Sequence, residues 1–400
     1  MFYYIIMNFN QAVDYLVNLG NDREEWDLDL INELLHKLKM PHRRIGTVIH
    51  ITGSNGKGSV CAMVANILKT AGYKVGLYTS PHLRRITERI KINNEDISKE
   101  VFSEYVQRIR PFVNGQSYFE VLTAIAFMYF ADNDVEFSII EVGLGGRLDA
   151  TNVVESDISV ITNVSLEHTK RLGENEEKIA LEKAGIIKEN SICVTGAEGD
   201  ALKVIERVCS QRNTELLVSR PTDFSRLGLK GDVQKDNAGT AIKIIKALKR
   251  KEFLIPKLHI LEGLESVKWP GRLEFISPRV LVDVAHNPAG ALYLANELKK
   301  FHEDFERVVL VFGVLADKDW KSMLDYLVSV VDEIILTKPN SERAAQPALL
   351  ERYLVKQFSL TPLIVENVKM AFDKAKTEAG KKDLVVVTGS FYTVGEIYHS

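Results

Sequence analysis

The sequence predicts an α/β protein made of two domains, each containing a mainly parallel sheet. Apolar runs rich in Val and Ile recur with little alternation, as in strands that are covered on both faces. Runs with helical spacing separate them, which indicates strand–helix–strand units with right-handed crossovers. The length of 400 residues is enough for two or three domains of ordinary size.

The first domain is expected over residues 1–266. Its strands and helices alternate from the first strongly apolar run onward. The expected strands are Val48–Thr52, Val75–Thr79, Phe137–Val142, Ile158–Thr162 and Ile192–Thr195. The expected helices are Gly58–Ala71, Phe119–Phe130 and Glu176–Ile187.

The second domain is expected over residues 267–400, after a junction near Leu261–Ser266. With about 130 residues it can bury a core of its own, and its strand–helix order predicts a smaller Rossmann-like fold. The expected strands are Val280–Val284, Arg307–Phe312, Glu333–Thr337, Pro362–Val365 and Leu384–Thr388. The expected helices are Pro288–Lys299, Trp320–Val330, Pro347–Gln357 and Val368–Ala379.

Composition and cysteine usage narrow the class of protein. Hydrophobic residues make up 46% and charged residues 26% of the chain, which is ordinary for a soluble globular protein. The formal net charge of -3 gives no basis for a nucleic-acid-binding surface. Cys61, Cys193 and Cys209 have no C-x-x-C spacing, which favours a reducing compartment over a disulfide framework or a zinc site.

The opening stretch Met1–Met7 is apolar but short. It lacks a cationic region and a cleavage site of small residues, so it is not expected to be a signal peptide. No apolar run approaches the length that a transmembrane helix needs. We therefore expect a cytoplasmic protein with no membrane partner.

The most informative stretch is a glycine-rich turn between an apolar strand, Val48–Thr52, and an apolar helix. A glycine loop lets backbone N–H groups converge on phosphate oxygens, and the helix N-terminus and a lysine add positive charge. The arrangement predicts ATP binding. The residues expected to bind the nucleotide here are Gly53, Ser54, Asn55, Gly56, Lys57, Gly58 and Ser59.

The loop departs from the general phosphate-loop pattern G-x-x-x-x-G-K-[ST] at two positions. Ile51 stands at the first glycine position, and Gly58 stands where Ser or Thr is usual. The alternative is a turn that binds no ligand. The strand before the loop and the helix after it favour the nucleotide.

A set of motifs in a fixed order extends this interpretation over nearly the whole chain. With them, the sequence resembles the folylpolyglutamate synthase and dihydrofolate synthase family, which belongs to the ATP-dependent Mur ligase superfamily. The resemblance implies a P-loop ATPase domain of the Mur ligase type, followed by a Rossmann-like glutamate ligase domain. The motifs are His50–Ser59, Thr79–Leu83, Thr87–Ile90, Phe119–Ala124, Glu141–Asn152, Leu166–His168, Glu182–Ile186, Trp269–Arg272, Asp283–Pro288, Asp317–Asp319 and Thr388–Phe391.

The activity implied by the resemblance is ATP-dependent addition of L-glutamate to a folate through an acyl phosphate, with Mg²⁺. Tetrahydrofolate polyglutamylation is the first choice, with conversion of dihydropteroate to dihydrofolate as a second activity. The alternatives are a dihydrofolate synthase alone, another Mur-type amide ligase, or, in a different class, a P-loop switch ATPase. We expect a monomer.

A cell-wall Mur ligase is the nearest of these alternatives. Those enzymes carry a UDP-binding domain before the phosphate loop. Here the loop begins at Gly53, so no such domain is expected before it.

The resemblance also assigns metal ligands. It implies that Ser80 and Glu120 hold a first Mg²⁺, and that His168 binds a second. Each has a simpler alternative: a turn before Pro81, a helix-start residue and an exposed loop histidine, respectively. Family members usually carry Asp where this chain has Glu167.

Catalytic residues implied by the resemblance are Lys57, Lys183, His168 and Arg147. Lys183 is expected to be carbamylated, which would turn a cation into an anion that supports Mg²⁺. From the residues alone, an exposed lysine is the alternative. Arg147 lies in the glycine-rich segment Gly143–Asn152, which is expected to reach the folate-binding cleft from the end of a strand.

The remaining nucleotide contacts follow from the same resemblance. Asn237 is expected to contact the adenine, Arg272 the phosphates, and Asp283 and His286 the nucleotide from the second domain. The Asp317–Asp319 loop is expected to help hold the incoming glutamate, with a helix N-cap as the alternative.

Overall fold

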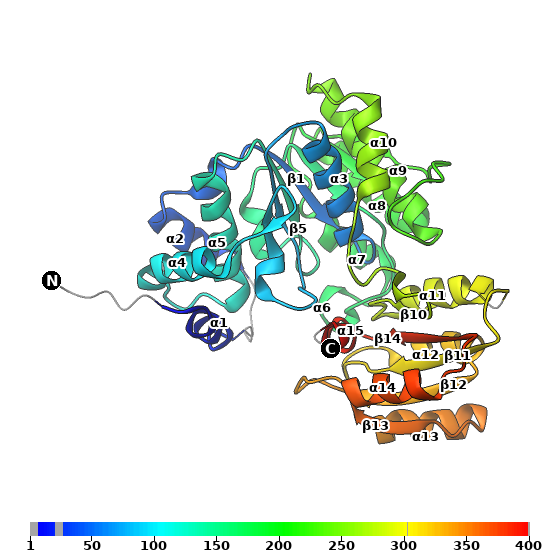
Figure 1. The fold of residues 1–400 in the computed structure, drawn as a ribbon. Helices are drawn as coiled ribbons and strands as arrows, with labels where there is room; N and C mark the ends of the chain where they lie inside the picture. The colour runs from blue at the N-terminus through cyan, green and yellow to red at the C-terminus, as the bar shows by residue number, and fades with distance from the viewer. Residues whose placement is uncertain (1–6, 21–26, 302, 399–400) are drawn as a thin grey trace. The chain divides into compact units, whose positions relative to one another are not determined.

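The computed structural model describes residues 7–20, 27–301 and 303–398 of the chain. The chain divides into two compact units. The first unit comprises Met1–Gly228 and Gln234–Val267, and the second comprises Leu229–Val233 and Lys268–Ser400. Figure 1 shows the fold, and each unit is described by itself.

The first unit contains an eight-stranded sheet with the order β4-β3-β2-β5-β1-β6-β7-β8. Strands β2, β5, β1, β6, β7 and β8 run parallel, whereas β3 and β4 add an antiparallel edge next to β2. The strands are β1 Thr47–Thr52, β2 Val75–Tyr78, β3 Ile90–Ile92, β4 Glu95–Asp96, β5 Phe137–Glu141, β6 Ile158–Ile161, β7 Ile192–Thr195 and β8 Glu215–Val218.

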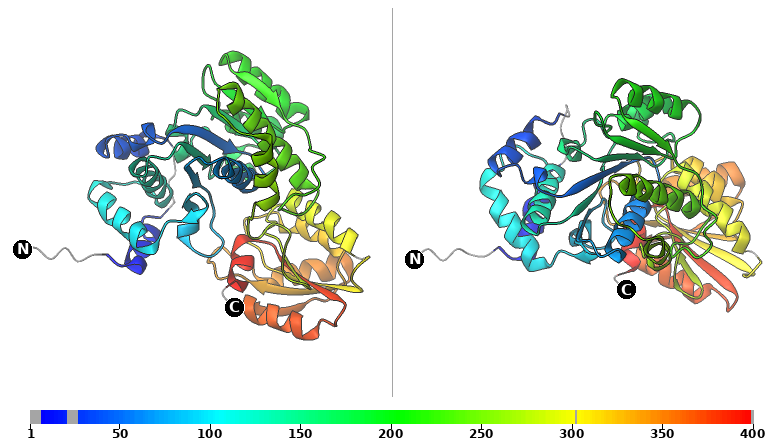
Figure 2. Two further views of the ribbon diagram at one scale, coloured as in Figure 1. Left: turned by 45° about the horizontal axis from the view of Figure 1, so that its top comes forward. Right: turned by 90° about the horizontal axis from the view of Figure 1, so that it is seen from above.

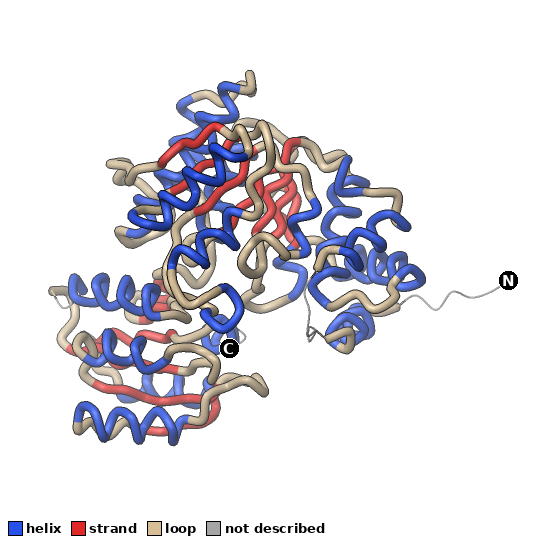
Figure 3. The backbone as a smooth tube through the Cα atoms, turned by 180° about the vertical axis from the view of Figure 1, so that it is seen from behind, coloured by secondary structure: helices blue, strands red, loops and turns tan. Residues whose placement is uncertain are grey.

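Helices cover this sheet on both faces, as the further views of Figure 2 and the tube of Figure 3 show. The central strands are apolar on both sides because neither face meets water. The helices are α1 Phe9–Val17, α2 Asp29–Lys37, α3 Lys57–Thr70, α4 Lys99–Ile109, α5 Tyr118–Asp132, α6 Thr169–Leu172, α7 Glu176–Ala184, α8 Gly199–Gln211, α9 Val233–Arg250 and α10 Lys257–Ser266.

Two helices show how the layers are built. Helix α3 is buried from Gly58 to Leu68, because it packs against β1, β2 and β5 on one side and α10 on the other. Helix α5 packs with α1, α2 and α4 on the opposite face, where Val48, Tyr78 and Ile140 join their core. Alternate residues of β1 therefore face different layers.

The second unit contains a six-stranded sheet with the order β13-β12-β11-β14-β10-β9, in which β9 alone is antiparallel. A core of Val308, Leu310 and Phe312 with residues of α11, α12 and α13 lies on one face. The strands are β9 Glu274–Ser277, β10 Val280–Val282, β11 Arg307–Phe312, β12 Glu333–Lys338, β13 Leu363–Asn367 and β14 Asp383–Thr388. The helices are α11 Pro288–Phe301, α12 Trp320–Val328, α13 Pro347–Phe358, α14 Val368–Glu378 and α15 Phe391–Ile397.

The predicted fold class is confirmed: both sheets are mainly parallel and both alternate with helices. The short antiparallel edge strands β3, β4 and β9 were not expected from the sequence. Within the described parts of the chain, no helix has both the length and the apolarity to cross a membrane.

The connections around β1 determine where a ligand can bind. From β1 the chain continues to β2, which lies on one side of β1 in the strand order. From β5 it continues to β6, which lies on the other side of β1. The loops after β1 and β5 therefore diverge at the carboxyl edge of the sheet. Such a switch point is where open α/β sheets bind ligands.

Candidate active site

The glycine-rich loop lies where the sequence predicts it, between β1 and α3. Gly53 has φ 148° and Gly56 has φ 80°, values that side-chain-bearing residues rarely adopt. A Cβ on Gly53 would lie 1.8 Å from Oγ1 of Thr162. Glycine is therefore required here for the loop to pass close to the end of β6.

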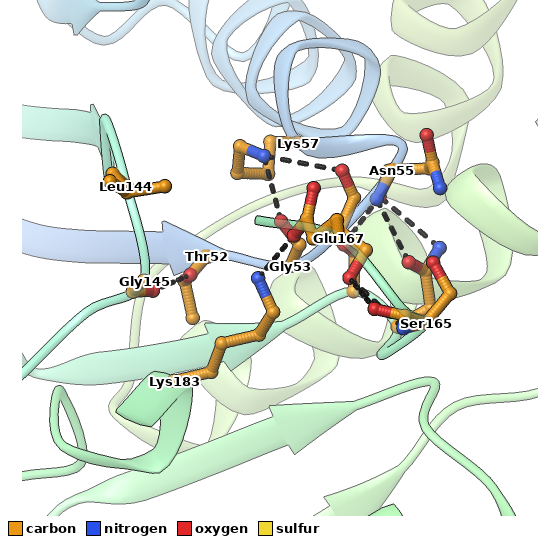
Figure 4. A network of polar contacts seen from close by, with 12 residues as sticks. Thr52, Gly53, Asn55, Lys57, Leu144, Gly145, Ser165, Glu167 and Lys183 are labelled. Carbon is orange, nitrogen blue, oxygen red and sulfur yellow. Dashed lines mark hydrogen bonds and ion pairs between the residues drawn. The ribbon is translucent and has the colours of Figure 1, made fainter. Parts of the chain in front are cut away.

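Residues after β6 hold this loop in shape. The N–H of Ser54 donates to the carbonyl of Asn163 at 3.0 Å, and the N–H of Asn55 donates to Oδ1 of Asn163 at 2.9 Å. The Thr162 hydroxyl donates to the Asn55 carbonyl at 2.6 Å, and the hydroxyl of Ser54 donates to the carbonyl of Ser165 at 3.1 Å. Figure 4 shows this network. The loop is thus preorganised by contacts within the protein.

Lys57 opens α3 and its side chain turns back over the loop. Its Nζ donates to the carbonyl of Gly53 at 2.7 Å and lies 3.4 Å from the carbonyl of Ser54 (Figure 4). These contacts hold a positive charge beside the helix N-terminus. A full charge next to a helix N-terminus suits an anionic ligand such as a phosphate.

Asn237 is brought to the same loop from α9. A Cβ on Gly56 would lie 2.2 Å from Oδ1 of Asn237, so the two residues are in close contact. Asn237 is buried, and its Nδ2 donates to Oε1 of Gln234 at 2.9 Å. The hydroxyl of Ser59 is also buried and has no hydrogen-bond partner among the described residues.

Ser80 lies beside a carboxylate that the sequence did not single out. Its N–H donates to Oε2 of Glu141 at 3.0 Å. Glu141 ends β5, is 4% exposed, and pairs in register with Ile51 of β1. The sequence feature that could have identified Glu141 is an acidic residue at the end of an apolar buried strand next to the phosphate loop.

Glu120 has a different role in this structure. Its Oε2 accepts the N–H of Ser117 at 2.8 Å and the hydroxyl of Ser117 at 2.7 Å. Ser117 in turn caps α5, so the pair forms a capping box. This is the helix-start alternative, and a metal at Glu120 stays a prediction.

Lys183 and Glu167 form a buried ion pair. Nζ of Lys183 lies 2.7 Å from Oε1 of Glu167, and the side chains are 1% and 8% exposed. Burial lowers the pKa of Lys183 to about 8, against the attraction of Glu167. For Glu167, burial alone would raise the pKa, but Lys183 and then Lys57 lower it to about 2. Lys183 is therefore not a solvent-exposed lysine.

The loop after β5 is held from within by Asp149. Its Oδ2 accepts the N–H of Leu144 at 2.9 Å, and its Oδ1 accepts the N–H of Thr151 at 3.0 Å. Burial raises the pKa of this carboxyl group. Arg147, by contrast, is exposed and forms a bidentate pair with Glu182 of α7, with Nη2 2.9 Å from Oε1.

Aromatic rings lie beside the same loop. A Cβ on Gly143 would be 2.7 Å from the Phe119 ring, and the rings of Phe119 and Tyr78 are stacked 6.1 Å apart. The guanidinium of Arg89 lies 5.6 Å from the centre of the Tyr118 ring. The sequence predicts no role for Phe119 beyond its place in the motif Phe119–Ala124.

His168 follows Glu167 and is the N-cap residue of the short helix α6. Its φ of 46° is left-handed, and the residue is exposed. Across residues 7–20, 27–301 and 303–398, no group of three or more His, Cys, Asp and Glu side chains could hold a metal ion by itself. A metal here would need hydroxyl, phosphate or water ligands as well.

In the second unit, Arg272 and His286 both contact Phe391. The Arg272 guanidinium lies 5.5 Å from the centre of the Phe391 ring, and the His286 ring lies 5.6 Å from it. Asp283 is engaged by the backbone: its carboxylate accepts the N–H groups of Leu273 and Ala285, both at 2.9 Å. Burial raises the pKa of Asp283.

The Asp317–Asp319 loop is occupied by contacts of its own. Asp317 forms a bidentate pair with Arg343, at 2.9 and 2.8 Å. Asp319 caps α12 by accepting the N–H of Ser322 at 3.2 Å. The N-cap alternative is therefore present, and a contact with glutamate stays a prediction.

Comparisons with known proteins identify the family of the chain. The Mur ligase middle domain matches residues 51–260, and the glutamate ligase domain of Mur ligases matches residues 271–391. A dihydrofolate synthase/folylpolyglutamate synthase of Escherichia coli is 33% identical, with 98% of this chain and 97% of the relative covered.

A relative in Haloferax volcanii is longer. It is a probable bifunctional folylpolyglutamate synthase/dihydropteroate synthase, 33% identical over 98% of this chain, and the chain spans 50% of its length. The chain thus covers about half of that relative.

Two solved structures share the fold over 98% of this chain and 97% of theirs. FolC of E. coli in complex with DHPP and ADP is 31% identical, with a TM-score of 0.87. A bifunctional folylpolyglutamate synthase/dihydrofolate synthase with Mn, AMPPNP and L-glutamate bound is 30% identical, with a TM-score of 0.88. The chain belongs to the folylpolyglutamate synthase/dihydrofolate synthase family and contains Mur ligase middle and C-terminal domains.

Proposed function

We propose that this protein is an ATP-dependent ligase that adds L-glutamate to a folate. The observation that carries the proposal is the preorganised phosphate loop, which ends at Lys57. This loop follows β1, and Glu141 ends the neighbouring strand β5. Solved relatives bind DHPP, ADP, AMPPNP and L-glutamate, which supports the same ligand classes here. Tetrahydrofolate polyglutamylation is the first activity, and glutamate addition to dihydropteroate is the second.

Magnesium is the divalent cation that we expect with ATP. Mg²⁺ prefers hard oxygen ligands, and the Glu141 carboxylate next to the Ser80 backbone provides one from a buried strand end. The donor set therefore fits, with Ser80 and Glu141 as the ligands. Glu120 remains in the capping box at the start of α5. His168 stays the candidate for a second metal. When bound, the metal supplies positive charge to the phosphoryl group.

The reaction needs an activated carboxylate. The carboxylate of the folate attacks the γ-phosphorus of ATP, ADP leaves, and an acyl phosphate forms. The α-amine of L-glutamate then attacks the acyl carbon, loses a proton, and phosphate leaves to give the amide. Lys57 and the N–H groups of the loop stabilise charge on the transferred phosphate.

Lys183 gives a second source of charge. A carbamate forms from a neutral amine and CO₂, and the lowered pKa of Lys183, about 8, leaves a fraction of the amine neutral near physiological pH. The proposed carbamate would replace the ammonium that now contacts Glu167. Its anionic oxygens would then be available to support a cation at the site.

The folate is proposed to bind along the loop after β5. The partly buried ring of Phe119 lies beside Gly143 and can stack on a flat heteroaromatic ring, with the buried Tyr78 ring stacked behind it. Arg147 is the exposed cation of this loop and could exchange its partner Glu182 for a substrate carboxylate.

Nucleotide contacts are also proposed beyond the loop. In the first unit, Asn237 lies against Gly56 and is the candidate for the adenine. In the second unit, the candidates for contacts with the phosphates and the rest of the nucleotide are Arg272, Asp283 and His286. The ring of Phe391 contacts Arg272 and His286.

A direct experiment separates this function from the alternatives. The purified protein is incubated with ATP, Mg²⁺, L-glutamate and either tetrahydrofolate or dihydropteroate, and the products are read by mass spectrometry. A product extended by one glutamate, with ADP formed only when both substrates are present, supports the proposal. ATP hydrolysis that needs neither substrate would point to a P-loop switch ATPase instead.

A further inference from the structure

Strand β1 carries two buried polar side chains that the proposed chemistry does not use. His50 and Thr52 alternate with Ile49 and Ile51, so both face the layer of α5, and both are 0% exposed. A polar group buried without a partner is costly, and apolar residues would suit a central strand better. The contacts of these two side chains therefore call for an explanation.

Both side chains bond to one loop, the segment Gly143–Thr151 that follows β5. The Thr52 hydroxyl donates to the carbonyl of Gly145 at 2.5 Å (Figure 4). Nε2 of His50 lies 2.8 Å from Oγ1 of Thr151. One side chain thus holds the tip of the loop, and the other holds its end.

The direction of the hydrogen bonds follows from their chemistry. The Thr151 hydroxyl donates its single proton to Oδ1 of Asp149, which also accepts the N–H of Thr151. His50 must then donate from Nε2, which leaves Nδ1 unprotonated. Nδ1 indeed has no hydrogen-bond partner among the residues that the structure describes.

A continuous chain of contacts results. It runs from His50 through Thr151 to Asp149, whose other oxygen accepts the N–H of Leu144 at 2.9 Å. The chain therefore begins on the strand that carries the phosphate loop and returns to the first residues of the glycine-rich loop. Thr52 immediately precedes Gly53, the first residue of the phosphate loop.

We propose that His50 and Thr52 are positioning residues that fix the Gly143–Thr151 loop relative to the phosphate loop. In this role they align the substrate carboxylate with the γ-phosphate without touching either. The inference rests on the proposed function, because it assumes that the folate lies along the loop after β5. Buried hydrogen bonds in a low-dielectric interior suit this role, because they favour a single arrangement.

The test compares isosteric and conservative variants in the full-length protein. His50→Leu removes the donor at similar size, and His50→Gln keeps an N–H donor at a similar reach. Thr52→Val removes the second contact. Thr195→Val is the matched control, because Thr195 is also 0% exposed and also donates to a backbone carbonyl, that of Ile161 at 2.9 Å.

The expected result is a selective effect on the folate side. His50→Leu and Thr52→Val raise the KM for tetrahydrofolate, or lower kcat, by about tenfold, the scale of one buried hydrogen bond. The KM for ATP changes by less than about twofold on the same reasoning. His50→Gln recovers most of the loss, and Thr195→Val lowers the melting temperature without changing either KM.

Other outcomes would overturn the proposal. If His50→Leu and Thr52→Val only lower the melting temperature and keep the parent kinetics, the two residues are merely structural. Equal increases in both KM values would exclude a role specific to the loop. Should His50→Leu not fold, Thr52→Val is read by the same criteria.

The parent protein is assayed first. If it forms no glutamylated product from tetrahydrofolate or dihydropteroate, the proposed function fails, whatever the variants do. If it is active, the variants test the positioning role alone.

Discussion

Nζ of Lys183 lies 2.7 Å from Oε1 of Glu167, and the pair is almost completely buried. The side-chain nitrogen of Lys183 has two alternative states. It is either an ammonium that pairs with the Glu167 carboxylate or a carbamate. The side chain of Glu167 places a carboxylate against this lysine. The two states can be distinguished by their response to CO₂.

Glu167→Gln should destabilise the protein by about 3–5 kcal/mol in CO₂-free buffer, because it leaves a buried ammonium without its partner. Added bicarbonate should reduce this loss, because a carbamate removes the cation. Chemical unfolding with and without bicarbonate measures both effects. The double variant Lys183→Met/Glu167→Leu is the control. It should lose less stability than Glu167→Gln, and added bicarbonate should not change its stability. A bicarbonate-independent loss in Glu167→Gln would argue against carbamylation.

Lys57→Ala should lower kcat by roughly 10²-fold or more, because the ammonium is proposed to stabilise the transferred phosphate. The fold should persist, since the hydrogen bonds of Lys57 Nζ to the described residues go to carbonyl groups of its own loop. Steady-state kinetics and circular dichroism measure the two properties. Lys69→Ala, at the other end of α3, is the control and should keep the parent kinetics. Near-parental kcat in a folded Lys57→Ala protein would refute the phosphate-loop assignment.

Glu141→Gln and Glu120→Gln distinguish the two candidate metal carboxylates. Each change keeps the size of the side chain and removes an anionic ligand. Glu141→Gln should raise the Mg²⁺ concentration needed for half-maximal activity. Glu120→Gln should mainly weaken the capping box, at a cost of about 0.5–2 kcal/mol. Magnesium titrations at fixed ATP test this, and a larger metal defect in Glu120→Gln would restore the assignment made from the sequence.

Buried histidines predict how stability depends on pH. Burial, and then the charge of Lys188, lowers the pKa of His50 from 6.5 to about 3. Between pH 3 and 6.5 the unfolded chain therefore binds one more proton at this residue than the native state does. The free energy of unfolding should fall on acidification through this window, by about 1.4 kcal/mol per pH unit.

His50→Gln isolates this contribution. The variant has no proton to gain at position 50, so its stability should fall less steeply between pH 6 and 4. His82 has a pKa lowered to about 3 by burial and then by Arg89, and it remains as an acid-sensitive group in both proteins. Urea unfolding at several pH values gives the slopes. Identical slopes in parent and variant would show that His50 is not held neutral.

Much of the fold could be predicted because the central strands are apolar and alternate with helices. Each strand expected from the sequence has its counterpart in the structure, from β1 to β14. Strands β3 and β4 could not be recognised, because three residues in one and two exposed acidic residues in the other carry no apolar pattern. Strand β3 forms by pairing with β2, and β4 by pairing with β3, so both depend on contacts beyond their own residues.

The site was less predictable for a related reason. The loop Gly53–Lys57 is local in sequence and was placed correctly between strand and helix. The choice between Glu120 and Glu141 beside Ser80 depends on the register of β2 and β5, in which Tyr78 pairs with Ile140. That register cannot be read from either strand alone.

Lys183 illustrates the same limit. Its helix is rich in charged residues, which is typical of an exposed surface. The side chain is nevertheless buried because Glu167, sixteen residues earlier, meets it. A contact between residues this far apart in the sequence arises only in the folded chain, where α7 packs against α6.

Phe391 gives the last prediction. The centre of its ring lies 5.5 Å from the Arg272 guanidinium and 5.6 Å from the centre of the His286 ring. Phe391→Leu should loosen both side chains and raise the KM for ATP by about fivefold, as expected for losing aromatic contacts of about 1 kcal/mol. Phe391→Tyr keeps the ring and should stay near the parent. The KM for tetrahydrofolate serves as the internal reference. If it rises as much as the KM for ATP, Phe391 has a general structural role, and Arg272 and His286 lose their support as nucleotide contacts.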